Sequence, residues 1–123
     1  MTNKGLSFKL IEKSVDSVKL ELEFSKEYPY FEGHFEGFPI LPALLQVHHA
    51  IEWSREYFVN IKNPSTINSI KFNRPITPSM KVNLNLNFDE VKKQIRFSYT
   101  LDEDLLSGGA MNIWVTLIKN FVL

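Results

Sequence analysis

Three stretches of the chain alternate apolar and polar residues with a period of two. They are residues 6–12 (LSFKLIE), 17–24 (SVKLELEF) and 80–88 (MKVNLNLNF). Successive side chains of a β-strand point to opposite faces, so this period is typical of half-buried antiparallel strands. Weaker strand patterns cover residues 66–72, 94–101 and 109–122, and we expect loops at 60–65 and near 102–108.

Residues 42–58 (PALLQVHHAIEWSREYF) are the only stretch with a convincing helical period, and Pro42 suits a first helical turn. Five residues fall near one face at spacings of three and four: Leu44, Val47, His48, Ile51 and Phe58. Further apolar residues widen this face, so we expect a mostly buried helix. Two strands, one helix and about four more strands predict a single α+β domain over residues 1–123, with an antiparallel sheet wrapped around the helix.

Composition narrows the function classes. Fourteen basic residues balance fourteen acidic ones, which argues against nucleic acid as the main partner. The chain has no cysteine, and hence no disulfide, thiol nucleophile or thiolate metal site. The first ten residues (MTNKGLSFKL) do not resemble a signal peptide, and no apolar run is long enough to span a membrane. We therefore expect a cytoplasmic protein.

Residues 28–42 (YPYFEGHFEGFPILP) combine three prolines, two glycines and five aromatic residues. Proline and glycine at this density exclude a regular helix and interrupt strands, which predicts a loop. A loop this apolar is expected to pack over the rest of the molecule. It carries His34, whose side chain can accept and return a proton near neutral pH.

The segment from Gly33 to Gln46 (GHFEGFPILPALLQ) strongly resembles the active-site segment of the hotdog-fold 3-hydroxyacyl-(acyl carrier protein) dehydratases. In that family a GHFPG…P…PG(V/C)L pattern precedes the central helix. Residues 72–78 (FNRPITP) resemble the family's FxRPVxPG segment, which forms a strand and a turn. The sequence is most similar to a divergent, aryl-polyene-type branch, and the resemblance implies a hotdog fold.

The resemblance also implies roles for individual residues. His34 would act as acid and base on the substrate's α-carbon or β-hydroxyl, and the backbone N–H of Ala43 would polarise the thioester carbonyl. Gly33, Phe35 and Phe38 would contribute to substrate binding. Four aromatic residues could line an acyl tunnel or could equally be plain core: Phe31, Phe35, Phe38 and Trp53.

One position departs from the family. Fourteen residues after its histidine, the family has a Glu or Asp on the central helix, and this chain has His48. The His34/His48 pair could still dehydrate, with one imidazole neutral and the other protonated, or His48 could only position a water or the hydroxyl. Glu52, one turn further on, could hydrogen-bond His48. His49 points roughly 100° away, and we expect a structural role for it.

We expect a lyase that dehydrates a 3-hydroxyacyl thioester to the trans-2-enoyl product, with the substrate carried on acyl carrier protein. An acyl thioesterase and a non-catalytic acyl-binding partner subunit remain alternatives. No metal or other cofactor is implied, and the family's site lies between protomers, so we expect a homodimer or a higher homo-oligomer. Four cations could meet an acidic carrier protein or simply face water: Lys62, Lys71, Arg74 and Lys81.

Overall fold

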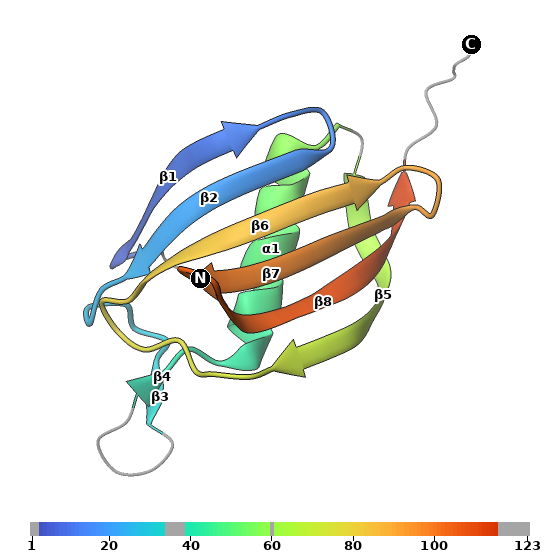
Figure 1. Ribbon diagram of the computed structural model, residues 1–123. Helices are drawn as coiled ribbons and strands as arrows, with labels where there is room; N and C mark the ends of the chain where they lie inside the picture. Colours follow the sequence, from blue (N-terminus) through green and yellow to red (C-terminus); the bar gives the residue numbers. More distant parts are fainter. Residues whose placement is uncertain (1–2, 34–38, 60, 116–123) are drawn as a thin grey trace.

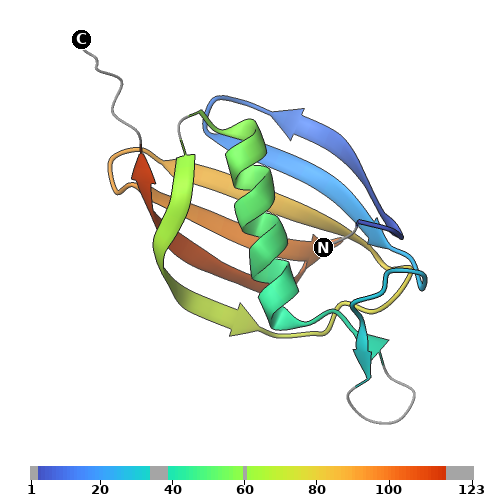
Figure 2. The ribbon, with the colours of Figure 1, turned by 180° about the vertical axis from the view of Figure 1, so that it is seen from behind.

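Six strands form one antiparallel sheet that curves around a single helix (Figure 1). A computed structural model describes residues 3–33, 39–59 and 61–115. The strand order is β1-β2-β6-β7-β8-β5, so β1 and β5 are the two edges. The elements are β1 (Leu6–Lys13), β2 (Ser17–Phe24), α1 (Ala43–Tyr57), β5 (Ile61–Phe72), β6 (Lys81–Asp89), β7 (Gln94–Leu101) and β8 (Asp104–Val115). Seen from behind, α1 lies across the concave face of the sheet (Figure 2).

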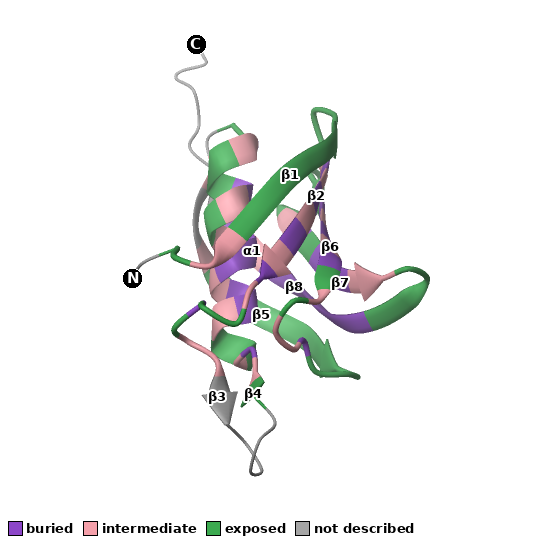
Figure 3. Ribbon diagram, turned by 90° about the vertical axis from the view of Figure 1, so that its left-hand side faces the viewer, coloured by how far each residue is buried: buried purple, intermediate pink, exposed green. Residues whose placement is uncertain are grey.

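The core lies between α1 and the inner face of the sheet. Pairing places Leu20, Leu84 and Tyr99 in one row across β2, β6 and β7, and all three are fully buried. Burial alternates along β2, as the period of two predicts (Figure 3). Since each buried leucine contributes about 1.5–3 kcal/mol relative to an exposed one, these rows hold the sheet against the helix. The predicted α+β architecture is confirmed.

Two strands begin earlier than the sequence pattern predicts. β5 begins at Ile61 rather than at residue 66, and β8 begins at Asp104 rather than at 109. Gly108 was predicted as the end of a loop and Gly109 as the first residue of the strand, but both lie well inside β8. A Cβ on Gly109 would stand 3.0 Å from the Phe97 ring, so the glycine allows close packing within the sheet. Residues 116–122 of the predicted last strand lie outside the described residues.

The buried face of α1 is rotated from the predicted one. Leu44 is 78% exposed, whereas Gln46 and His49 are buried beside Val47 and Ala50. The prediction was wrong because it assigned the inner face from apolarity alone, and buried polar side chains are accepted where they find hydrogen-bond partners. None of the described residues forms a helix long and apolar enough to cross a membrane.

The segment of residues 28–42 packs against the core at both described ends. Tyr28 and Leu41 are almost completely buried, and Phe31 packs edge-on against Phe24 and Tyr28. Between them, β3 (Glu32–Gly33) pairs with β4 (Pro39–Ile40) as a short hairpin that was not predicted. This hairpin projects beyond the end of the sheet near the start of α1 (Figure 1).

Candidate functional site

The two segments that resemble the dehydratase pattern meet at the start of α1. The N–H of Leu41 donates to the carbonyl of Ile76 at 2.8 Å, which ties the first segment to the turn of the second. Both segments line one pocket of about 320 Å³. Its walls are Ile40, Leu41, Pro42, Ala43 and Gln46 from the first segment, and Phe72, Asn73, Arg74 and Pro75 from the second.

The N-terminus of α1 opens beside this pocket without a side-chain cap. The N–H groups of Leu45 and Gln46 both donate to the carbonyl of Pro42, at 3.0 and 3.1 Å. The first turn holds no acidic residue, and the N–H groups of Ala43 and Leu44 have no acceptor among the described residues. Unpaired donors and the positive end of the helix dipole favour an oxygen that gains negative charge. The geometry therefore suits the role predicted for Ala43.

Gln46 anchors this first turn to the sheet. Its amide nitrogen donates to the carbonyl of Leu41 at 3.2 Å, and its amide oxygen accepts from the Ser107 hydroxyl at 2.6 Å. The Tyr99 hydroxyl donates to the main-chain carbonyl of Gln46 at 2.6 Å, and complete burial raises the pKa of Tyr99 so that it keeps this proton. Gln46 was not predicted as a site residue. The available signal was a polar residue, one turn into the helix, between apolar neighbours.

His48 is half-buried and lies outside the buried face of α1 that carries Gln46, Val47 and Ala50. It lines a cleft of about 490 Å³ between β1 and α1, together with Phe8 of β1 and with Glu52, Trp53 and Glu56 of the helix. His49 lines the cleft as well, so the cleft gathers two imidazoles, two carboxylates and aromatic rings. Within the described ranges, no three His, Asp or Glu side chains are grouped closely enough to hold a metal ion.

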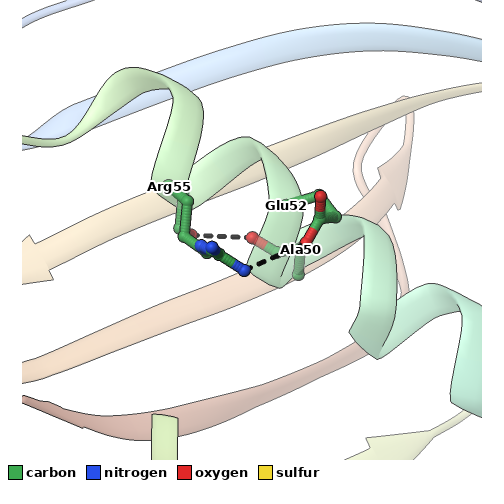
Figure 4. Close-up of polar contacts among 4 residues, drawn as sticks. Ala50, Glu52 and Arg55 are labelled. Carbon is green, nitrogen blue, oxygen red and sulfur yellow. Dashed lines mark hydrogen bonds and ion pairs between the residues drawn. The ribbon is translucent and has the colours of Figure 1, made fainter. Parts of the chain in front are cut away.

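Glu52 does not make the hydrogen bond to His48 that the sequence suggested. Its carboxylate contacts the Arg55 guanidinium at 3.5 Å, on the exposed surface of the helix (Figure 4). The His48 side chain makes no hydrogen bond to another described residue, although its ring lies 5.3 Å from that of His49. Because an exposed ion pair of this kind contributes little to stability, Glu52 is only weakly held where it stands.

His49 is buried and its ring nitrogen is satisfied. The Tyr28 hydroxyl lies 2.9 Å from Nε2, and the rings of Phe24 and Trp53 each lie 5.5 Å away. Burial, with a smaller contribution from His48, lowers the pKa of His49 to about 4. Burial, with a smaller contribution from Tyr30, raises the pKa of Tyr28 to about 12. The hydrogen-bonded pair is therefore neutral at pH 7, as in a structural core contact.

Three predicted site residues, His34, Phe35 and Phe38, lie outside the described residues. Gly33, just before them, pairs with Pro39 in the β3–β4 hairpin. The hairpin brings Gly33 and Pro39, which flank residues 34–38, together beside the start of α1. The pairing of His34 with His48 stays a prediction.

The cations predicted to meet a carrier protein have different surroundings where the structure describes their side chains. Arg74 forms an ion pair with Asp104 at 2.7 Å and lines the pocket at the start of α1. Lys71 lines a different groove, described below. Lys81 lies exposed at the start of β6. Lys62 belongs to β5, and its side chain is outside the described part of the chain.

Comparison with known proteins places this site in a family. A curated 3-hydroxyacyl-[acyl-carrier-protein] dehydratase, FabZ of Herpetosiphon aurantiacus, is 30% identical over 93 residues. The match covers 68% of this chain and 66% of that protein.

Solved structures share the fold. A chain of the dehydratase heterocomplex ApeI:P from Xenorhabdus doucetiae superposes with a TM-score of 0.77 at 24% identity, over 85% of this chain and 93% of that one. An uncharacterised protein from Erwinia carotovora subsp. atroseptica superposes with a TM-score of 0.64 at 25% identity, over 93% and 95%. The hotdog fold expected from the sequence is confirmed.

The sequence pattern of one family spans both segments that form the pocket. The ApeI-like family, described as ApeI dehydratase, matches residues 10–110. These residues include the whole of α1 and five of the six strands of the main sheet in full or in large part. The divergent, dehydratase-like branch suggested by the sequence is the one that the family match supports, and the chain belongs to the ApeI-like dehydratase family of hotdog proteins.

Proposed function

We propose that this protein dehydrates a 3-hydroxyacyl thioester, carried on acyl carrier protein, to the trans-2-enoyl thioester in fatty-acid or polyene-type lipid biosynthesis. The observation that carries the proposal is the uncapped first turn of α1. Its Ala43 N–H lies beside a pocket built from both family segments. The family match and the similarity to FabZ support the reaction class.

The chemistry follows from where charge develops. A base removes the proton from C2, and the thioester oxygen gains negative charge that the Ala43 N–H can stabilise. The C3–O bond then breaks, and the departing hydroxide takes up a proton and leaves as water. The reaction involves no net oxidation or reduction, so one base and one acid are sufficient for it.

We assign the base and the acid to His34 and His48. His48 is half-buried and lines an open cleft, so a substrate can reach its ring. His34 takes the role that the family pattern gives to its histidine. Dehydration needs one neutral side chain that accepts the C2 proton and one protonated side chain that donates to the departing hydroxide, and an imidazole can fill either role.

The test is an incubation with 3-hydroxyacyl carrier proteins of several chain lengths, followed by intact mass. We expect the loss of one water from the acyl group with the wild-type protein and no loss with His34→Ala. His49→Gln is the matched control, since it also removes an imidazole but one that is neutral and hydrogen-bonded. Equal turnover by His34→Ala and the wild type would contradict the assignment, and loss of the acyl group would identify a thioesterase.

We also propose that the active form is a dimer that pairs through β5. This strand is an edge of the sheet and carries partly exposed apolar side chains, Ile67, Ile70 and Phe72. Leu44 on the neighbouring helix is largely exposed as well. Such surfaces mark interfaces more often than free faces. Light scattering after gel filtration distinguishes a homodimer from a monomer, and a monomer that is inactive alone would favour a subunit that works with a different partner chain.

A further inference from the structure

The outer face of the sheet carries a groove that the proposed reaction does not use. It has a volume of about 510 Å³. Its polar residues come from β5, β6 and β7, and β8 adds Gly108; the polar residues are Ser69, Lys71, Asn87, Arg96 and Ser98. Lys71 was among the cations singled out from the sequence. Its neighbours in the groove were not.

Strand pairing shows that these residues share the face opposite α1. Ser98 pairs with Gly108, and Gly108 pairs with Lys71. Ser98 and Arg96 flank Phe97, whose side chain belongs to the buried core. Because side chains alternate along a strand, Ser98 and Arg96 must point outward. The register then carries Lys71 to the same side.

Neither cation of the groove is neutralised. Among the described residues, no carboxylate lies within ion-pair distance of Lys71 or Arg96, and the ion pairs that form involve Arg55 and Arg74. The carboxylates of the outer face lie outside the groove lining. The whole chain has no net charge, so the positive character of the groove is a local property. Such a local field attracts anions.

The groove can bring both charges to one ligand. Lys71 and Arg96 stand on β5 and β7, two strands apart, which is about 10 Å across a sheet. Both side chains are long and exposed, and Gly108 between them has no side chain to cover the floor. Two hydroxyls and the Asn87 amide add uncharged donors around the same space.

We propose that this outer groove binds a phosphate group, as a phosphate ester or a diphosphate. A phosphate monoester carries a charge of about −1.5 to −2 at pH 7 and three strong acceptor oxygens. That matches two cations surrounded by further donors. A carboxylate, with one charge and two oxygens, would leave one cation and several donors unused.

The test uses the full-length ¹⁵N-labelled protein in phosphate-free buffer at low ionic strength. Inorganic phosphate, pyrophosphate and acetate are added in separate titrations, each against sodium chloride of equal ionic strength. We expect saturable shifts of the Ser98 and Gly108 amides with phosphate and pyrophosphate. Pyrophosphate should bind more tightly because it can meet both cations.

Charge variants decide whether the groove is responsible. We expect Arg96→Gln and Lys71→Gln each to weaken pyrophosphate binding at least about fivefold. Lys9→Gln, which removes an exposed cation from β1, should leave binding unchanged. Three results would overturn the proposal: equal weakening by Lys9→Gln, acetate binding as tight as phosphate, or shifts that do not saturate. All three side chains are exposed, so we expect each variant to fold like the wild type, and the rest of its amide spectrum checks this.

Discussion

Polar residues on the two sides of α1 differ in burial and in hydrogen bonding. On the side that faces the sheet, Gln46 and His49 are buried, and each has a hydrogen-bond partner at 2.6–3.2 Å. Outside this buried face, His48 is half-buried and Glu56 is exposed, and both line an open cleft beside β1 that His49 also reaches. The buried polar residues fix the position of the helix, whereas the His48 side chain has no hydrogen bond within the described structure and is accessible to a substrate.

The strongest test of this comparison is to remove the inner anchor. Gln46→Leu keeps the approximate shape but leaves the Ser107 hydroxyl and the Leu41 carbonyl without a partner. We expect a loss of about 2–4 kcal/mol in the free energy of unfolding, because unsatisfied buried groups cost about 1–3 kcal/mol each. Urea denaturation measures it.

A second substitution serves as the control for this experiment. Gln46→Leu with Ser107→Ala removes the donor together with its acceptor, so the pair should lose less than the sum of the single variants. Additive losses would show that the hydrogen bond itself contributes little and that shape alone anchors the helix.

The next test uses pH. His49 is neutral in the folded protein, with a pKa of about 4 against 6.5 in the unfolded chain. The unfolded chain binds the proton more readily, so this contribution to stability is complete above pH 6.5 and is lost as the pH falls toward 4. We expect a loss of about 2–3 kcal/mol from this group over that window, since one pKa unit corresponds to about 1.4 kcal/mol.

The pH effect can be assigned by comparing two imidazoles on one helix. Denaturation midpoints from pH 4 to 7 should lose this part of their slope in His49→Gln and keep it in His48→Gln. A slope that survives in His49→Gln would mean that other groups, mainly carboxylates, cause all of it.

The smallest expected effect on stability is that of replacing His48, the half-buried imidazole outside the buried face of α1. His48→Ala removes no hydrogen bond within the described structure, so we expect the free energy of unfolding to change by less than about 0.5 kcal/mol. Dehydration of the 3-hydroxyacyl substrate should nevertheless fall at least about a hundredfold, as for loss of an acid or base. If His48→Ala lost as much stability as Gln46→Leu, His48 would be a structural residue like Gln46, and the difference between the two sides of the helix would not hold.

The sequence predicts most where one physical rule dominates. In β2 and β6 the alternation of side chains gives both the strand and its buried face, and the segment around Pro42 gives the start of α1. The rule fails where an unexpected polar group is buried, since Gln46 looks like a surface residue until its partner Ser107 is known. It also fails for Gly108, which was predicted as the end of a loop but lies inside β8.

The site is less predictable than the fold for the same reason. The motifs indicate Ala43, and the structure places it at an uncapped helix end beside the second motif. Nothing in the spacing indicates that Tyr99, in a strand more than fifty residues away, donates to the first turn of that helix. Contacts of this kind depend on tertiary structure.

The order of strands has a consequence for how the molecule folds. β6, β7 and β8 are neighbours in the sheet and consecutive in the chain, whereas β2 must find β6 across the whole central segment. Contacts close in sequence cost less chain entropy to form, so we expect the meander of residues 81–115 to make up the folding nucleus. Core substitutions such as Leu86→Ala should then slow refolding, while Val18→Ala should mainly speed unfolding. The N-terminal half of the chain, which bears the predicted catalytic residues, would thus fold last.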